Sequence, residues 1–260
     1  MTKKPSSKVA LITGASSGIG YELTKLFAEN GYNVCFSARR LEKLSKLSET
    51  LRQTGSQVLP IQCDCKDKQE VQTMVQHCLK QFGHIDIAIA NAGCSETNPG
   101  TQFSSQAVEN TFQTNVMGVA YLYEAIIPHM IKRQTGHLVS IASLASYRGM
   151  PESGTYCASK SALVTLTEGL RLDLKKSGIT VSTINPGFIK SEITDKNTFP
   201  MPFLLETKRG AQHIYNAIQK KKTLYEFPWP LVFIMKLIRQ LPICLFDPLF
   251  SKVKSPKKSQ

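Results

Sequence analysis

The chain has 260 residues, of which 42% are hydrophobic and 20% are charged, and its formal net charge is +13. This length fits one large α/β domain, and this composition excludes an intrinsically disordered chain. Part of the positive charge lies at the two ends and in Lys220–Lys222 rather than in a recognition motif, so we expect no nucleic-acid partner.

Two kinds of apolar pattern alternate in chain order through the first 184 residues. Short runs rich in apolar residues predict strands at 8–13, 32–37, 57–62, 85–90, 137–142 and 179–184, and the first run is continuously apolar over Val9–Ile12, as in a strand buried on both faces. Helical spacing of apolar residues predicts helices at 18–30, 41–55, 67–82, 104–133 and 155–177. Because parallel strands need crossover connections, the alternation predicts an α/β, doubly wound parallel sheet with helices on both faces. Ligands of such sheets bind at the carboxyl ends of the strands.

The cysteines and histidines show no pattern of a disulfide framework or a metal site. Seven cysteines occur without a CxxC pair, and five histidines are scattered. We therefore expect reduced thiols in a cytoplasmic protein and no metal. Residues 1–7 are too polar for a signal peptide, and no uncharged apolar stretch reaches the ~20 residues of a membrane-spanning helix.

A glycine-rich turn follows the first predicted strand and opens the first predicted helix. It reads Thr13-Gly14-Ala15-Ser16-Ser17-Gly18-Ile19-Gly20. Glycines allow close backbone approach to a phosphate, and a helix N-terminus offers N–H donors and a positive dipole end. No Gly-Lys-Ser/Thr follows, which excludes a P-loop. The turn therefore predicts a dinucleotide site, the alternative being a purely structural turn.

Tyr156 and Lys160 stand four residues apart near the start of a predicted helix, on one face. A free phenol, with a pKa of about 10, is a poor acid or base at neutral pH, and a nearby ammonium would lower that pKa. The pair fits a tuned proton donor, although a Tyr/Lys pair can also be a solvated helix face.

The ordered set of motifs resembles the short-chain dehydrogenase/reductase family, in its common short form, over roughly residues 7–195. The set comprises the glycine turn, Asn91-Ala92-Gly93, Asn115, Ser143, the Tyr156/Lys160 pair and Pro186-Gly187. The family often has two asparagines where this chain has Ala90-Asn91, a common departure. The resemblance implies a nicotinamide cofactor, a small-molecule alcohol or carbonyl substrate and a homo-oligomer, either a dimer or a tetramer.

The resemblance also implies a role for each catalytic candidate. Tyr156 would exchange a proton with the substrate oxygen, and Ser143 would orient the carbonyl. Lys160 would hold the nicotinamide ribose and lower the pKa of Tyr156. Asn115 would fix a water that links the lysine to solvent. The cofactor supplies the hydride, so the protein contributes position and electrostatics.

The end of the second predicted strand indicates the cofactor. It reads Ser37-Ala38-Arg39-Arg40, without the carboxylate that would favour NAD. Arg39 can pair with a 2′-phosphate, so we expect NADP(H), the alternative being that both arginines are solvated surface. The remaining expected cofactor contacts are Gly14, Ser16, Ser17, Gly18, Ile19, Gly20, Asp64, Asn91, Ala92, Gly93, Tyr156, Lys160, Pro186, Gly187, Ile189 and Ser191.

Two functions remain open from the sequence. The first is an NADP(H)-dependent oxidoreductase, and the second is a non-catalytic NADP(H)-binding redox sensor or scaffold. The intact Ser143, Tyr156 and Lys160 set favours the enzyme. An apolar stretch at 188–205 lies where a substrate lid is expected, which favours a lipophilic substrate and leaves its identity open.

The sequence pattern changes from Phe199 onward, so we expect a dinucleotide-binding and catalytic core at 1–198. A lid and an amphipathic, basic extension of the same domain would occupy 199–260. Residues 231–241 fit a helix with a wide apolar stripe, Pro230 in its first turn and Pro242 at its end. With the basic residues 252–258, this segment fits peripheral binding to a membrane surface. Packing on its own lid or on a second subunit is the alternative.

Overall fold

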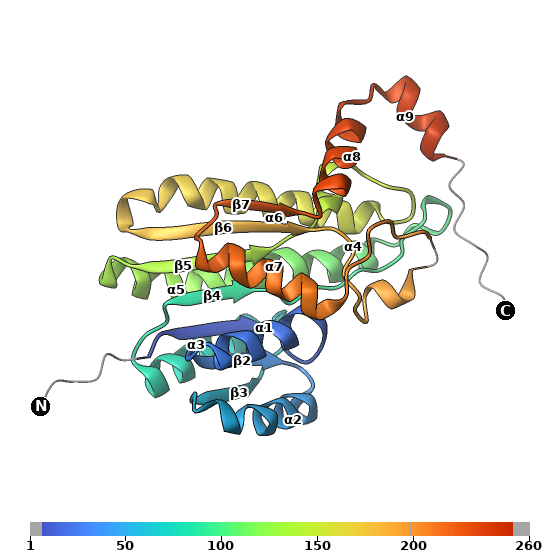
Figure 1. Ribbon diagram of the computed structural model, residues 1–260. Coiled ribbons are helices and arrows are strands. Elements are labelled where there is room, and N and C mark those ends of the chain that lie inside the picture. Colours follow the sequence, from blue (N-terminus) through green and yellow to red (C-terminus); the bar gives the residue numbers. More distant parts are fainter. Residues whose placement is uncertain (1–6, 198, 252–260) are drawn as a thin grey trace, which may run out of the picture.

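The computed structural model describes residues 7–197 and 199–251, in which strands and helices alternate (Figure 1). The strands are β1 (Val9–Thr13), β2 (Asn33–Ala38), β3 (Val58–Gln62), β4 (Ile87–Ala90), β5 (Gly136–Ile141), β6 (Ile179–Pro186) and β7 (Leu224–Phe227). The α-helices are α1 (Gly18–Glu29), α2 (Leu41–Leu51), α3 (Lys68–Phe82), α4 (Ser105–Phe112), α5 (Gly118–Arg133), α6 (Gly154–Asp173), α7 (Thr207–Gln219), α8 (Trp229–Gln240) and α9 (Ile243–Phe250).

All seven strands form one parallel sheet in the order β3-β2-β1-β4-β5-β6-β7. The six strands predicted from the sequence are all present, and the Rossmann-like doubly wound fold is confirmed. The strand order reverses direction between β1 and β4, which is where such folds open a crevice for ligands.

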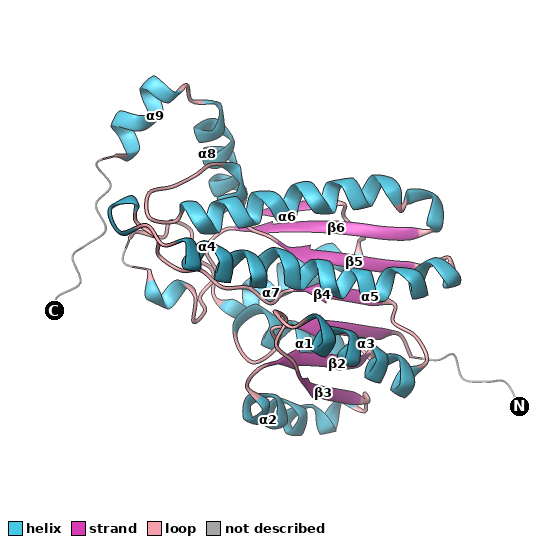
Figure 2. Cartoon of the chain, turned by 180° about the vertical axis from the view of Figure 1, so that it is seen from behind, coloured by secondary structure: helices cyan, strands magenta, loops and turns pink. Residues whose placement is uncertain are grey.

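The sheet separates two apolar cores, which explains its continuously apolar strands. Alternate residues of β1 point to opposite faces, so Ile12 joins the core under α1, α2 and α7, and Leu11 joins the core under α3, α5 and α6. Phe27 on the first face and Met74 on the second are fully buried. Figures 1 and 2 show helices covering both faces of the sheet.

The long helical region predicted at 104–133 is confirmed, because α4, a π-helical segment at Gln113–Met117 and α5 follow one another without a gap. A π-helix inserts an extra residue into the turn, and such segments often occur at functional sites. Helical spacing continues with little change on either side, so the sequence pattern did not reveal the π-helical segment.

The structure also moves the boundary of the core beyond residue 198. β7 pairs with β6 as the last strand of the sheet, and α7 packs against α1 and the sheet. The sequence placed both outside the expected core. β7 has only four residues and lies at an edge, so its apolar signal is weak. α7 carries Ala211, Ile214, Tyr215 and Ile218 at helical spacing, a pattern that could have identified it.

The predicted helix at 231–241 is confirmed as α8, with Pro230 in its first turn. Leu231 and Met235 on its inner side are buried against Leu144, so this side packs on the protein itself. α8 and α9 project beyond the sheet in both views (Figures 1 and 2). The described helices include none with the length and hydropathy of a membrane span. The basic residues 252–258 lie outside the described residues.

Candidate active site and cofactor pocket

A cavity of about 540 Å³ opens at the carboxyl ends of the strands on both sides of the β1–β4 reversal. Most of the expected site residues line it: Gly14, Ser16, Ser17, Gly18, Ile19, Arg39, Arg40, Asp64, Asn91, Ala92, Gly93, Ser143, Tyr156, Lys160, Pro186, Gly187, Ile189 and Ser191. Gly20 and Asn115 are not among the described residues that line the cavity. Tertiary folding thus gathers residues that span almost 180 positions of the chain.

The glycine turn brings its backbone to the cavity wall. Gly14 and Gly18 have φ angles of +71° and +58°, which side chains rarely adopt. A Cβ built on Gly14 would lie 2.8 Å from the Cα of Ala92. Within the described helix α1, the Ser17 side chain makes no capping hydrogen bond, which leaves the first-turn N–H groups free of a side-chain cap. Open backbone and uncapped donors fit a dinucleotide phosphate.

Gly20 has a packing role, and its expected cofactor contact stays a prediction. A Cβ at this position would clash with the carbonyl oxygen of Gly14 and lie 2.5 Å from the amide nitrogen of Asn91. The missing side chain therefore lets α1 approach the turn from behind. Asn91 joins two strands: its Nδ2 donates to the carbonyl oxygen of Thr13 at 2.9 Å, and its backbone N–H donates to Thr13 Oγ1 at 3.1 Å. These bonds join β4 to β1.

Three polar side chains converge from the end of β5 and from α6. Ser143 follows β5, and its hydroxyl accepts a hydrogen bond from the backbone N–H of Ala145 at 3.1 Å. Lys160 is 4% exposed, and its Nζ donates to the carbonyl oxygen of Ile141 at 2.9 Å. The same Nζ lies 5.8 Å from the centre of the Tyr156 ring. All three residues line the cavity, as the sequence predicted.

Burial controls protonation at this cluster. It raises the pKa of Tyr156 to about 12, and the nearby Ser143 hydroxyl opposes that rise. Burial lowers the pKa of Lys160 to about 8. The sequence led us to expect that the lysine would lower the phenol pKa, whereas in the structure desolvation outweighs any such effect. Tyr156 therefore holds its proton at neutral pH.

Asn115 lies behind the cavity, in the π-helical segment. It is fully buried, its Oδ1 accepts from the backbone N–H of Cys94 at 2.8 Å, and its Nδ2 donates to the Cys94 carbonyl oxygen at 2.9 Å. Nδ2 also lies 3.0 Å from Ser159 Oγ on α6. A Cβ built on Gly93 would lie 3.3 Å from Asn115 Oδ1 and 3.6 Å from Lys160 Nζ. Asn115 thus fixes the loop after β4 beside the lysine.

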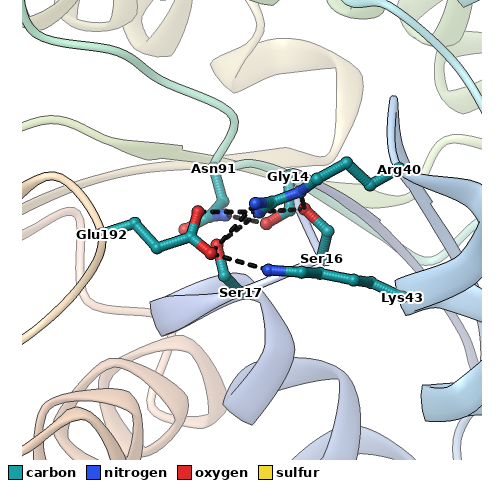
Figure 3. Close-up of polar contacts among 7 residues, drawn as sticks. All are labelled: Gly14, Ser16, Ser17, Arg40, Lys43, Asn91 and Glu192. Atoms are coloured by element: carbon teal, nitrogen blue, oxygen red, sulfur yellow. Dashed lines mark hydrogen bonds and ion pairs between the residues drawn. The ribbon is translucent and has the colours of Figure 1, made fainter.

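The end of β2 carries a polar cluster that the sequence showed only in part (Figure 3). Arg40 donates to Ser16 Oγ at 2.8 and 3.1 Å and to Ser17 Oγ at 3.0 Å. It also forms an ion pair with Glu192 at 2.9 Å, and Lys43 pairs with the same carboxylate at 2.8 Å. Glu192 lines the cavity from a segment 152 residues away, so no local pattern could have identified it.

These two cations hold the pKa of Glu192 at about 2, well below that of a free carboxyl. The carboxylate is therefore charged throughout the neutral range. Arg39 is exposed and lines the cavity next to this cluster. The edge of the cavity at the end of β2 thus carries the positive charges of Arg39 and Arg40 and the negative charge of Glu192.

Cysteines also line the cavity, although the sequence offered no reason to place them there. Burial raises the pKa of Cys63 to about 12 and that of Cys65 to about 11. Both thiols are protonated at neutral pH, so they are poor nucleophiles. Within the described ranges 7–197 and 199–251, no group of His, Cys, Asp and Glu could hold a metal ion.

An apolar cluster lies beside Ser143. The adjacent residue Leu144 is buried against Leu231 and Met235 of α8, with Phe188 packed at the edge. Phe188 also contacts Phe199 edge to face, with ring centres 6.0 Å apart. The inner side of α8 therefore packs behind Ser143 and Gly187, which line the cavity, whereas the cluster residues themselves are not among the described residues that line it.

Comparisons with known proteins agree with this geometry. A family model described as short chain dehydrogenase matches residues 8–200. An uncharacterized oxidoreductase of Myxococcus xanthus is 37% identical over 242 residues, which are 93% of this chain and 96% of the relative. A short chain dehydrogenase/reductase from Burkholderia phymatum in complex with NAD has a TM-score of 0.83 at 24% identity and covers 98% of each chain. An actinorhodin polyketide ketoreductase with NADPH has a TM-score of 0.79 at 25% identity, over 87% of this chain and 97% of that chain.

Proposed function

Because the chain belongs to the short-chain dehydrogenase/reductase family of oxidoreductases, we propose that it uses NADP(H) to interconvert an alcohol and a ketone, with Tyr156 as the acid/base. The observation that carries the proposal is that Ser143, Tyr156 and Lys160 line the same cavity as the glycine turn. When bound, NADPH supplies a hydride.

In the direction of reduction, the protein has to deliver a proton and hold the carbonyl. Tyr156 keeps its proton at neutral pH and can donate it to the substrate oxygen as negative charge develops there. The Ser143 hydroxyl donates a second hydrogen bond to the same oxygen. Lys160 would hold the nicotinamide ribose, and Asn115 keeps the loop after β4 in place beside the lysine.

Two features of the β2 end support a preference for NADP(H). Ala38 stands where NAD-selective members of such folds carry a carboxylate for the ribose 2′-hydroxyl. Arg39 and Arg40 line the same rim, and a guanidinium can pair with a phosphate through two hydrogen bonds. Solved relatives contain NAD in one case and NADPH in another, so relatives alone do not choose between them.

The substrate that we propose is a lipophilic carbonyl compound or the corresponding alcohol. Its support is the apolar cluster of Leu144, Leu231, Met235 and Phe188 beside Ser143. In our proposal, residues up to about 198 bind the cofactor and supply the acid/base, while residues 199–251 cover the substrate end and complete the sheet with β7. A homo-oligomer follows only from the family, and light scattering coupled to gel filtration measures it.

The test is NADPH oxidation with a panel of apolar ketones and aldehydes. Tyr156→Phe should remove turnover while leaving NADPH binding nearly unchanged. Tyr32→Phe is the matched control, because Tyr32 hydrogen-bonds Gln219 at 3.0 Å and does not line the cavity in the described chain. NADPH binding without turnover of any compound would favour the alternative function, a redox sensor or scaffold.

A second proposal concerns the outer side of α8 and α9. Trp229, Phe233 and Leu237 repeat every four residues on α8 and are 79%, 60% and 54% exposed. Ile243 and Leu249 on α9 are 70% and 63% exposed. Four lysines follow at positions 252–258. We propose that this surface rests on an anionic membrane, because exposed apolar side chains that are followed in the sequence by lysines suit an interfacial segment.

Vesicle sedimentation tests this surface. Truncation before Tyr225 would remove β7 from the sheet, so point substitutions are the better variants. Replacing Trp229, Phe233 and Leu237 by Ser should abolish sedimentation with anionic vesicles. Leu172→Ser is the control, since Leu172 is 60% exposed on α6. If the unchanged protein stays in the supernatant at low salt, the surface does not bind membranes.

A further inference from the structure

Glu192 places a negative charge among the cations at the cofactor rim. Arg40 Nη1 donates to Glu192 Oε1 at 3.0 Å, Arg40 Nη2 lies 2.9 Å from Oε2, and Lys43 Nζ lies 2.8 Å from Oε1. Arg40 at the same time holds the hydroxyls of Ser16 and Ser17 in the glycine turn. Figure 3 shows the carboxylate facing both cations across the turn.

The segment that presents Glu192 is fixed by its own hydrogen bonds. The backbone N–H of Ser191 donates to Thr194 Oγ1 at 2.8 Å, and Thr194 Oγ1 donates to the Ile189 carbonyl oxygen at 3.0 Å. Ile189 in turn bridges to Leu205, across the segment expected to be the substrate lid. Glu192 therefore links the lid at 188–205 to the cations at the end of β2.

The Glu192 carboxylate resembles part of a phosphate group, because both carry negative charge on oxygen atoms that accept hydrogen bonds. Arg40 and Lys43 would stand close to a ribose 2′-phosphate bound at the end of β2, and Ser16 offers it a hydroxyl. The Glu192 carboxylate engages the same donors. Both ion pairs are exposed, with 43–49% of each side chain accessible, and such pairs contribute little to stability. A phosphate with two charges can therefore displace the carboxylate.

We propose that Glu192 is an internal competitor for the 2′-phosphate of NADP(H): cofactor binding exchanges the carboxylate for the phosphate at Arg40 and Lys43. This inference rests on the proposed NADP(H) preference. It makes Glu192 a residue that sets the affinity for the phosphorylated cofactor.

The test uses two ligands that differ only by the 2′-phosphate, adenosine 5′-monophosphate and adenosine 2′,5′-bisphosphate. Their affinities are measured by calorimetry with the unchanged protein, Glu192→Gln and Asp195→Asn. Asp195→Asn also removes one negative charge, but three residues further along the segment, so it measures the effect of net charge on binding without the contact to Arg40 and Lys43.

In Glu192→Gln, we expect the bisphosphate to bind about 3- to 10-fold more tightly, as loss of two weak competing ion pairs implies. The monophosphate and the Asp195→Asn variant should change less than twofold.

Equal gains for both ligands, or no gain for the bisphosphate, would overturn the competition. If the unchanged protein binds both ligands equally and Glu192→Gln prefers the bisphosphate, the proposed cofactor preference fails and the competition stands. If the unchanged protein prefers the bisphosphate and Glu192→Gln changes nothing, the competition fails alone.

Discussion

Gly14 offers a quantitative test of the glycine turn as a cofactor site. In Gly14→Ala, the new methyl group would lie 2.8 Å from the Ala92 Cα, and the φ of +71° would be strained. A left-handed conformation costs a residue with a side chain roughly 1–2 kcal/mol. A clash with rigid backbone adds about 1–3 kcal/mol, because the loop after β4 must shift. We therefore expect a loss of about 2–5 kcal/mol in the free energy of unfolding.

Gly31→Ala is the matched control for the strain alone. Gly31 has a φ of +79°, and no described atom lies within 4 Å of a Cβ built there. We expect this variant to lose only about 1–2 kcal/mol. Because Gly14 lines the cavity and Gly31 ends α1 on the surface, only Gly14→Ala should weaken NADPH binding, by at least about tenfold if one phosphate contact is lost.

The assays are urea unfolding and a fluorescence titration with NADPH, both at pH 7. Equal destabilisation by the two substitutions would show that the approach of Gly14 to Ala92 is not as close as the structure has it. Normal NADPH binding by Gly14→Ala would refute the assignment of the turn to the cofactor.

Three further predictions concern catalysis, cofactor choice and pH. Tyr156→Phe should lower turnover by about 10²–10⁴-fold, measured as NADPH oxidation, because the proton donor is lost; near-normal turnover would contradict its role. Arg39→Ala should weaken NADPH binding by about tenfold or more and leave NADH binding within about twofold, since it loses a charged contact to the 2′-phosphate; equal losses for both cofactors in calorimetry would argue against this. Burial lowers the pKa of His137 to about 4, so the unfolded chain binds the extra proton between pH 6.5 and 4, and stability falls as pH falls through that window. The loss from pH 7 to pH 5 should be about 2 kcal/mol smaller in His137→Gln than in the unchanged protein, measured by urea unfolding at both pH values; identical losses would mean that His137 does not stay neutral.

The sequence by itself determined the strands β1 to β6 and the motifs of the site. A parallel strand buried on both faces must be continuously apolar, as Val9–Ile12 is, so its signal is local. The glycine turn and the Tyr156/Lys160 pair are also local, because neighbouring residues on one turn or one helix face share their surroundings. Their order along the chain was enough to identify the family.

Only the tertiary structure decided the features that depend on distant partners. β7 is an edge strand of four residues, and its pairing with β6 is visible only in the folded sheet. Glu192 meets Arg40 across 152 positions. The direction of the Tyr156 pKa shift depends on burial of the phenol, which a spacing of four residues does not report. Desolvation and ion pairing are set by everything packed around a group, and that environment exists only once the chain has folded.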